Sequence, residues 1–195
     1  VGGPGYWLWT FTNATTTVYV VDAGRGRDVV QRVVGADYPG VLVSDCLNIY
    51  DEATPHQHKC YSHHLKAVSE ALETLGRAGN DYLLQVRALL RTGIWLKALQ
   101  GPAPDPRFAL CVDTLKARAH RLLDAPRAQP VEEKVRLRLW KQRDHLFTFL
   151  ERVQVPATNN LAERQLRPAV IARKISCGNK TPKGAQAWAV LASLA

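Results

Sequence analysis

The 195-residue sequence predicts an α+β fold whose core is interrupted by an all-helical insertion. Two observations support this prediction: strand-like segments are confined to the first 45 residues, and the stretch from about 64 to 153 reads almost entirely as helix. A basic helix then follows. We therefore expect a first core part at residues 1–63, a helical insertion at 64–155 and a second core part at 156–195.

The first core part begins with an expected antiparallel hairpin. Residues 6–12 and 16–22 are aromatic and β-branched, and a short Asn-Ala-Thr loop joins them. Residues 27–34 carry apolar side chains at helical spacing before Gly35, which predicts a helix. The short apolar run 40–45 ends in an acid and predicts a buried, central strand.

The expected insertion consists of helices separated by glycine and proline. They cover residues 64–76, 80–100, 106–124 and 130–153. Residues Leu83 to Leu99 of the second helix form a broad apolar stripe, which predicts a packed bundle. The tryptophans are assigned to cores because each lies in an apolar run: Trp7, Trp9, Trp95, Trp140 and Trp188.

The composition favours an anionic partner. Lys and Arg number 26 against 17 Asp and Glu, which gives a net charge of +9 and an isoelectric point near 9.7. Nucleic acid is the first candidate. No run approaches the roughly 18 apolar residues of a membrane span, so we expect no membrane partner and a cytoplasmic location.

A lone carboxylate, Glu163, stands in the most basic segment. Residues 159–183 contain six Lys or Arg residues and this one acid. One interpretation is structural: Asn160 and Glu163 have the spacing of a helix capping box, and Arg167 lies four residues after Glu163. The other interpretation is catalytic, and a helix start that fixes a carboxylate is compatible with both.

The basic side chains around Glu163 are candidates for contacting DNA phosphates. The alternative is an ordinary solvated helix face. The candidates are Arg164, Arg167, Arg173, Lys174, Lys180 and Lys183.

Cys60 and His63 have the spacing of half a zinc site, but no second pair at matching spacing follows. The four cysteines, Cys46, Cys60, Cys111 and Cys177, are scattered and do not suggest a disulfide framework. Free thiols are the expectation, and a zinc-stabilised interaction domain is a weaker hypothesis.

A second acid, Asp45, ends the predicted central strand. Ligands of α/β sheets gather at the carboxyl ends of strands, so Asp45 and Glu163 would share one site if the ends of the helical insertion meet. Two carboxylates could then bind Mg²⁺ for phosphoryl transfer. On local sequence alone, Asp45 could equally be a strand-end or turn acid.

Four motifs together resemble the DDE transposases of the insertion-sequence sixty-six family, in order and approximate spacing. They are Tyr6-Trp7-Leu8-Trp9-Thr10-Phe11, Gly40-Val41-Leu42-Val43-Ser44-Asp45, Cys60-Tyr61-Ser62-His63-His64-Leu65, and Asn159 to Pro168 with Arg173-Lys174. The resemblance spans nearly the whole chain.

The resemblance implies a ribonuclease-H-like core, with a mixed sheet and flanking helices, interrupted by the helical insertion. It matches Asp45 to the second catalytic aspartate and Glu163 to the catalytic glutamate. It further implies two Mg²⁺ ions, with Mn²⁺ as a substitute. The implied partners are transposon-end and target DNA, with homo-oligomers forming on that DNA.

The chain departs from the family pattern at its start. The first catalytic Asp of the family precedes the Tyr-Trp-Leu-Trp strand, and residues 1–5 contain no acid. We therefore expect a transposase fragment, truncated at both ends, that cannot catalyse strand transfer by itself. The alternative is a catalytically inactive remnant that still binds DNA.

Overall fold

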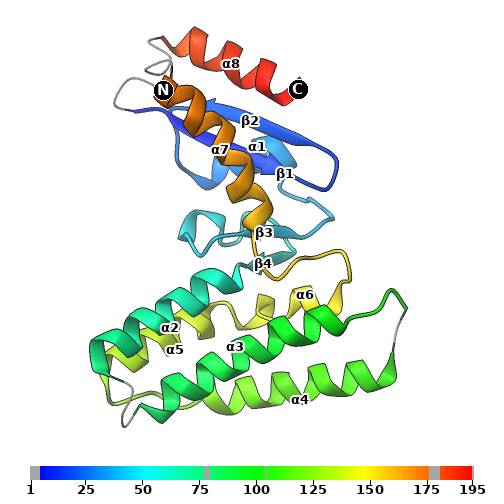
Figure 1. Cartoon of the computed structure of the whole chain (residues 1–195), viewed down its shortest axis with the longest axis vertical. Helices are drawn as coiled ribbons and strands as arrows, with labels where there is room; N and C mark the ends of the chain where they lie inside the picture. Colours follow the sequence, from blue (N-terminus) through cyan, green and yellow to red (C-terminus); the bar gives the residue numbers. More distant parts are fainter. Residues whose placement is uncertain (1–4, 77–79, 104, 176–180, 195) are drawn as a thin grey trace. The chain divides into compact units, whose positions relative to one another are not determined.

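The computed structural model describes residues 5–76, 80–103, 105–175 and 181–194 and has an α+β fold that is mostly helical (Figure 1). The α+β class is thus confirmed. The chain divides into two compact units. The first comprises Val1–Asp37, Asn48–Ala53 and Asn159–Ala195, and the second comprises Tyr38–Leu47 and Thr54–Thr158. The predicted domain boundaries at residues 63/64 and 155/156 stay a prediction.

The first unit contains the expected hairpin. Strand β1 (Trp7–Thr12) pairs antiparallel with β2 (Thr17–Asp22), in a register that runs from Trp7 opposite Asp22 to Thr12 opposite Thr17. The loop is closed by Asn13, whose side-chain oxygen accepts hydrogen bonds from the N–H groups of Thr15 at 2.9 Å and Thr16 at 2.8 Å. An Asn side chain commonly closes turns in this way, and the hairpin prediction is confirmed.

Helices pack against both strands of this hairpin (Figure 1). The other elements of the first unit are α1 (Arg27–Val34), η1 (Asn48–Tyr50), α7 (Asn160–Ile175) and α8 (Pro182–Leu194). Tyr19 of β2 connects the hairpin to α7 and α8. Its N–H donates to Ser193 Oγ at 2.9 Å, and its hydroxyl donates to the Gln165 carbonyl at 2.5 Å. On α8, Ala185 and Ala189 are buried one turn apart, and their small side chains let the helix approach the sheet closely.

The second unit begins with two short parallel strands, β3 (Leu42–Ser44) and β4 (Gln57–Lys59). The prediction of a central strand at residues 40–45 is wrong, because β3 has three residues and, among the residues that the structure describes, pairs only with β4. Strand β4 was not predicted. Its sequence is Gln-His-Lys, yet all three residues are buried, so tertiary packing overrides a polar composition.

The rest of the second unit is a helical bundle. Its elements are α2 (Tyr61–Leu75), α3 (Asp81–Leu99), α4 (Pro106–Leu123), α5 (Pro130–Lys141), η2 (Arg143–His145) and α6 (Thr148–Glu151). Helix α3 packs against α2 and α4, and α5 also packs against α2 and α4, around one apolar core (Figure 1). Asp105 and Gln129 cap α4 and α5 with their side chains, and a proline occupies the first helical position of each.

The prediction of one helix over residues 130–153 is wrong. Regular α-helix ends at Lys141, and the next hydrogen bonds, from the His145 N–H to Gln142 and from the Leu146 N–H to Arg143, have the tighter three-residue spacing. This break redirects the chain so that the side chains from Leu146 to Leu150 are all buried.

Gly93 lets α3 approach the start of α2. A Cβ atom at this position would lie 3.0 Å from Tyr61 Cε1 and 3.3 Å from Phe149 Cζ. Tyr61 and Phe149 are fully buried and meet edge to face with ring centroids 4.6 Å apart. Tyr61 is also fixed by its hydroxyl, which donates to the Leu146 carbonyl at 2.8 Å.

The segments that enter and leave the helical bundle meet within the second unit. The Ala157 carbonyl accepts a hydrogen bond from the Tyr61 N–H at 3.0 Å, and it also lies 3.2 Å from His58 Nε2. The other ring nitrogen of His58 lies 3.4 Å from the His145 carbonyl. The chain therefore leaves the helical bundle at Ala157, beside the point where it entered at Tyr61. Ala157 lies three residues before α7 begins.

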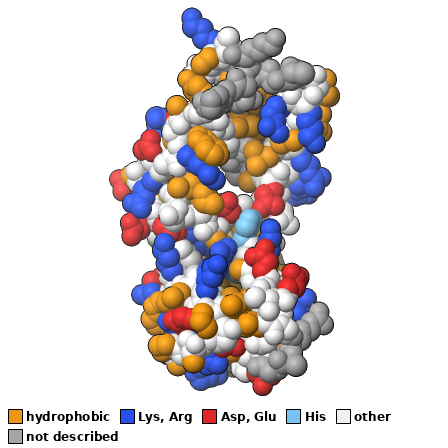
Figure 2. All heavy atoms as spheres, turned by 90° about the vertical axis from the view of Figure 1, so that its left-hand side faces the viewer, with side chains coloured by type: hydrophobic (Ala, Val, Ile, Leu, Met, Phe, Trp, Pro, Cys, Tyr) orange, Lys and Arg blue, Asp and Glu red, His pale blue; other side chains and the backbone are white. Residues whose placement is uncertain are grey.

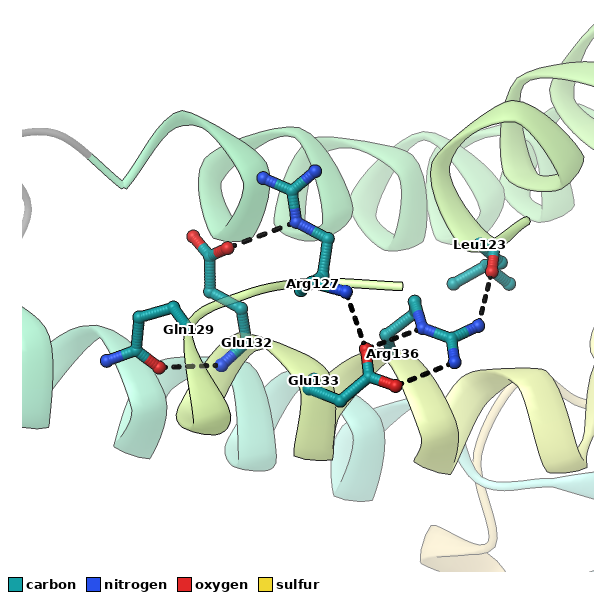
Figure 3. A network of polar contacts seen from close by, with 6 residues as sticks. All are labelled: Leu123, Arg127, Gln129, Glu132, Glu133 and Arg136. Carbon is teal, nitrogen blue, oxygen red and sulfur yellow. Dashed lines mark hydrogen bonds and ion pairs between the residues drawn. The ribbon is translucent and has the colours of Figure 1, made fainter. Parts of the chain in front are cut away.

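A polar network fixes the loop between α4 and α5 (Figure 3). Arg127 Nε pairs with Glu132 at 3.1 Å, and the Arg127 N–H donates to Glu133 at 2.8 Å. Arg136 forms a two-pronged pair with Glu133, at 2.7 and 2.8 Å, and donates to the Leu123 carbonyl at 2.7 Å. Both acids of α5 are thereby held on the loop side of the helix.

Two tryptophan assignments are wrong. Trp95 on α3 is 61% exposed and Trp7 on β1 is 43% exposed, whereas Trp9 is buried as expected. Leu99, at the end of the predicted apolar stripe, is also exposed. The stripe is broader than the surface that α2 and α4 cover, and Trp7 instead lies under the guanidinium of Arg25, 4.2 Å from its ring centroid.

Candidate functional site

Asp45 lies directly after β3, where the strand reaches its carboxyl end. It is half-buried, and its Oδ1 accepts a hydrogen bond from the Leu47 N–H at 2.9 Å. This contact is the turn that the structural interpretation of the residue predicted. The second carboxylate oxygen, Oδ2, has no hydrogen-bond partner within the described part of the chain, so the turn leaves half of the carboxylate for another ligand.

Buried polar groups hold the backbone at Asp45. Ser44 Oγ donates to the Asp45 carbonyl at 3.0 Å and accepts from Lys59 Nζ at 3.2 Å. The Ser44 carbonyl accepts from the Cys60 N–H at 2.9 Å. Lys59 is only 1% exposed. Sequence reasoning missed Lys59 because a lone lysine between polar residues carries no signal of burial.

Glu163 is exposed in the first turns of α7. The expected capping box with Asn160 is not formed at the expected residues: the Asn159 carbonyl accepts from the Glu163 N–H at 3.2 Å, which places the cap at Asn159. A capping box joins the cap to the third helical residue, here Ala162, so Glu163 lies one position too late for that role. Glu163 has a further interaction within the chain, and its capping and catalytic interpretations both stay predictions.

The basic residues predicted to contact DNA, Arg164, Arg167, Arg173 and Lys174, are all exposed on α7. At about 100° per residue, Arg164, Arg167 and Lys174 share one face with Glu163, and Arg173 lies roughly half a turn away from Arg164. Lys183 is exposed on α8, whereas Lys180 lies outside the described residues. Figure 2 shows that Lys and Arg side chains also occur at many other places on the surface.

Cys60 and His63 lie at the start of α2, where the Cys60 carbonyl accepts from the His63 N–H at 3.2 Å. The buried Cys60, the half-buried Cys46 and the exposed Cys111 are thiols rather than halves of a disulfide, as expected, whereas Cys177 lies outside the described residues. Cys46 Sγ is 3.7 Å from a ring nitrogen of His64. Nevertheless, the described residues contain no group of three or more His, Cys, Asp or Glu that could hold a metal ion.

Burial keeps two histidines of this region neutral. It lowers the pKa of His58 to about 4 and that of His64 to about 3. Neutral imidazoles can bind a metal, but His58 is already directed at the Ala157 and His145 carbonyls. These side chains are better explained as parts of the core beneath the strand ends than as zinc ligands.

The fold and these residues define a basic α+β protein with one acid at a strand end and another on a basic helix. The family model described as Transposase IS66 family matches residues 3–187, and the chain therefore belongs to this family. Membership supports a role in transposition, a process that acts on DNA. No curated protein and no solved structure shows a significant match. Across the described ranges, no helix is both long and apolar enough to cross a membrane.

The structure places Asp45 in the second unit and Glu163 in the first. Each stands at a position that a sequence motif had singled out; Asp45 is half-buried and Glu163 is exposed. Arg138, on α5, was not predicted. Its Nη2 lies 3.5 Å from the His63 carbonyl, and it interacts with the Cys46 thiol next to Asp45. Nothing in the local sequence distinguishes Arg138 from the other cations of this helix.

Proposed function

We propose that the chain belongs to the catalytic domain of a DDE transposase, with a ribonuclease-H-like core, in which Asp45 and Glu163 contribute to one metal-binding site. The observation that carries this proposal is the state of Asp45: its backbone is fixed by buried groups while Oδ2 has no partner among the described residues. A carboxylate held in this way is preorganised for a hard cation.

The contacts between the two ends of the helical bundle support the proposal of a shared site. Ala157, three residues before α7, is bonded to Tyr61, and Cys60 is bonded to Ser44, which precedes Asp45. Within the second unit, the segment that ends before α7 and the segment that ends at Asp45 thus both bond to residues 60 and 61, although they are far apart in sequence. Glu163 does not occupy the capping-box position that competed with this assignment.

Asp45 and Glu163 would hold Mg²⁺, or Mn²⁺ in its place, because both offer hard oxygen ligands. When bound, such ions activate the attacking oxygen and stabilise the leaving oxygen of a phosphodiester. Arg164, Arg167, Arg173 and Lys174 would contact phosphates of the transposon-end or target DNA, which the complete enzyme would cleave and join. Homo-oligomers on the DNA are part of the same proposal.

Mn²⁺ binding, followed by the electron paramagnetic resonance of the free ion, tests the metal assignment. We expect Asp45→Asn and Glu163→Gln each to weaken binding at least about tenfold, since changes even outside the ligand shell cost 10–100-fold. Asp113→Asn, an exposed acid on α4, is the matched control. If both site variants bind Mn²⁺ as the wild type does, the assignment is wrong.

A catalytically inactive DNA-binding protein is the second candidate. It is favoured by one observation, namely that Arg164, Arg167, Arg173 and Lys174 are all exposed on α7. This candidate predicts DNA binding that depends on Arg164 and Arg167, together with Mn²⁺ binding that is insensitive to Asp45 and Glu163. The two assays together therefore separate it from the enzyme.

A further inference from the structure

We propose that Arg138, on helix α5 of the helical bundle, binds a DNA phosphate beside Asp45, and that Lys134 contacts the same DNA one helical turn earlier. The inference rests on the proposed function and deepens it. It adds to α7 a second DNA-binding surface, on a part of the chain that the sequence suggested was only a packed bundle.

The first argument is the position of Arg138. Its Nη2 lies 3.5 Å from the carbonyl of His63, in the first turn of α2. Its guanidinium also interacts with the Cys46 thiol: burial raises the pKa of this thiol, and the charge and hydrogen bond of Arg138 oppose that rise. Because Cys46 directly follows Asp45, α5 delivers a permanent positive charge to the end of β3.

The second argument is the unused hydrogen-bonding capacity of Arg138. Its Nε is buried without a hydrogen-bond partner, and the described carboxylates include none that pairs with Arg138 or with Lys134. A guanidinium has five N–H donors in a planar fork that fits phosphate oxygens. A half-buried cation without a counter-ion is costly, so an incoming phosphate that reached the terminal N–H groups of Arg138 would compensate its charge.

The third argument is that nearby groups do not cancel this charge. The acids of α5, Glu132 and Glu133, are committed to Arg127 and Arg136 in the loop network (Figure 3). His64, against Cys46, stays neutral because burial lowers its pKa to about 3. Asp45 is the acid next in sequence to Cys46, and in the proposed function its charge is shared with the metal ions.

The fourth argument is the accessible face of α5. Lys134 and Arg138 are four residues apart, so they lie on one face of the helix. Lys134 is exposed, and Leu137 between them is 49% exposed. This face is therefore open to a ligand as long as a DNA backbone, along which successive phosphates could reach first one cation and then the other.

Equilibrium binding of a labelled DNA duplex, measured by fluorescence anisotropy over a range of salt concentrations, tests the inference. We expect Arg138→Gln to weaken binding about tenfold, as when one charge-assisted hydrogen bond is removed. The slope of log affinity against log salt should fall by about one for each phosphate that the variant no longer neutralises. Lys134→Gln should reduce the slope with a smaller effect on affinity, and Arg138→Lys should retain the slope but bind more weakly than the wild type.

Arg121→Gln on α4 is the matched control, because it removes an equally permanent charge from an exposed position of the same bundle. We expect no change in affinity. Thermal unfolding followed by circular dichroism shows whether each variant is folded.

Protection of a cysteine from alkylation in the wild-type chain gives a test that does not depend on the folding of any variant. Cys46 is half-buried beside Arg138, and Cys111 is exposed on α4. We expect duplex DNA to slow the alkylation of Cys46 by iodoacetamide several-fold while Cys111 reacts at an unchanged rate. Mass spectrometry of the digested protein reads both sites in one sample.

The inference is overturned if DNA leaves Cys46 alkylation unchanged, or if Arg138→Gln matches the wild type in affinity and slope while Arg164→Gln and Arg167→Gln weaken binding. That second pattern leaves the proposed function standing. A wild-type chain that does not bind DNA at all would instead contradict the proposed function.

Discussion

Replacing Gly93 with Ala sets helix propensity against packing. In the interior of a helix, Gly→Ala adds about 1 kcal/mol of stability. Here, however, the new Cβ would lie 3.0 Å from Tyr61 Cε1 and 3.3 Å from Phe149 Cζ. Overpacking of this kind costs about 1–3 kcal/mol, and the cost depends on whether the neighbours can move.

The neighbours of Gly93 have little freedom to move. Tyr61 and Phe149 are both 0% exposed, and the Tyr61 hydroxyl is tied to the Leu146 carbonyl. We therefore expect the packing cost to exceed the propensity gain, with a net loss of about 1–2 kcal/mol. For a chain of this size the midpoint of thermal unfolding should fall by about 3–6 °C.

Urea unfolding followed by far-ultraviolet circular dichroism measures this loss. Ala88→Gly, at an exposed position of the same helix, calibrates propensity alone and should cost about 1 kcal/mol. The reasoning is refuted if Gly93→Ala is as stable as the wild type or more stable, because helix propensity would then outweigh the contacts with Tyr61 and Phe149.

Three further predictions concern pH and single contacts. The hydrogen bonds from Arg136 and Arg127 lower the pKa of Glu133 to about 2, so its contribution to stability is present above its ordinary pKa of 4.5 and is lost as the pH falls towards 2. In Glu133→Gln, the free energy of unfolding should therefore decrease less between pH 4.5 and 2 than it does in the wild type. Burial lowers the pKa of His58 to about 4, so on acidification the unfolded chain takes up a proton at a higher pH than the folded chain does, and the free energy of unfolding should fall between pH 6.5 and 4. Amide hydrogen exchange at β4 should accelerate over that range. No acceleration would count against a neutral His58. Tyr19→Phe removes the bond to the Gln165 carbonyl and should cost about 1 kcal/mol in urea unfolding, whereas Tyr6→Phe at an exposed position should cost nothing measurable.

The elements that the sequence predicts well are those whose pattern is local. The hairpin follows from alternating aromatic and β-branched residues with an Asn at the turn. The helices α2 to α4 and the start of α5 follow from the 3.6-residue period and from the glycines and prolines between them. In each case the residues that make the element also contain the signal, so no tertiary information is needed.

The misses share one cause, which is dependence on distant neighbours. Strand β4 is polar in sequence and buried in the fold because α6 and the chain near Ala157 cover it. Trp95 is apolar in sequence and exposed in the fold because no described element covers it. A propensity scale contains neither fact.

The candidate site divides in the same way. Asp45 and Glu163 were singled out by the family resemblance, because the local sequence alone favoured a turn acid and a helix cap, and their catalytic roles stay a prediction. Arg138 and Lys59 were not found, because their importance arises from what the fold places next to them. The cap at Asn159 rather than Asn160 is a one-residue difference that moves Glu163 from the third to the fourth helical position.

The contact between Tyr61 and Ala157 also has a consequence for how the chain folds. It closes a loop of roughly 100 residues, which in an unfolded chain costs about 4 kcal/mol of entropy for a few hydrogen bonds in return. The contacts of α2 with α3, α3 with α4 and α4 with α5 join neighbours in sequence and carry a much smaller entropic cost. We therefore expect the bundle to assemble first and to bring its own ends together, so that the segment leading to Glu163 becomes ordered late in folding.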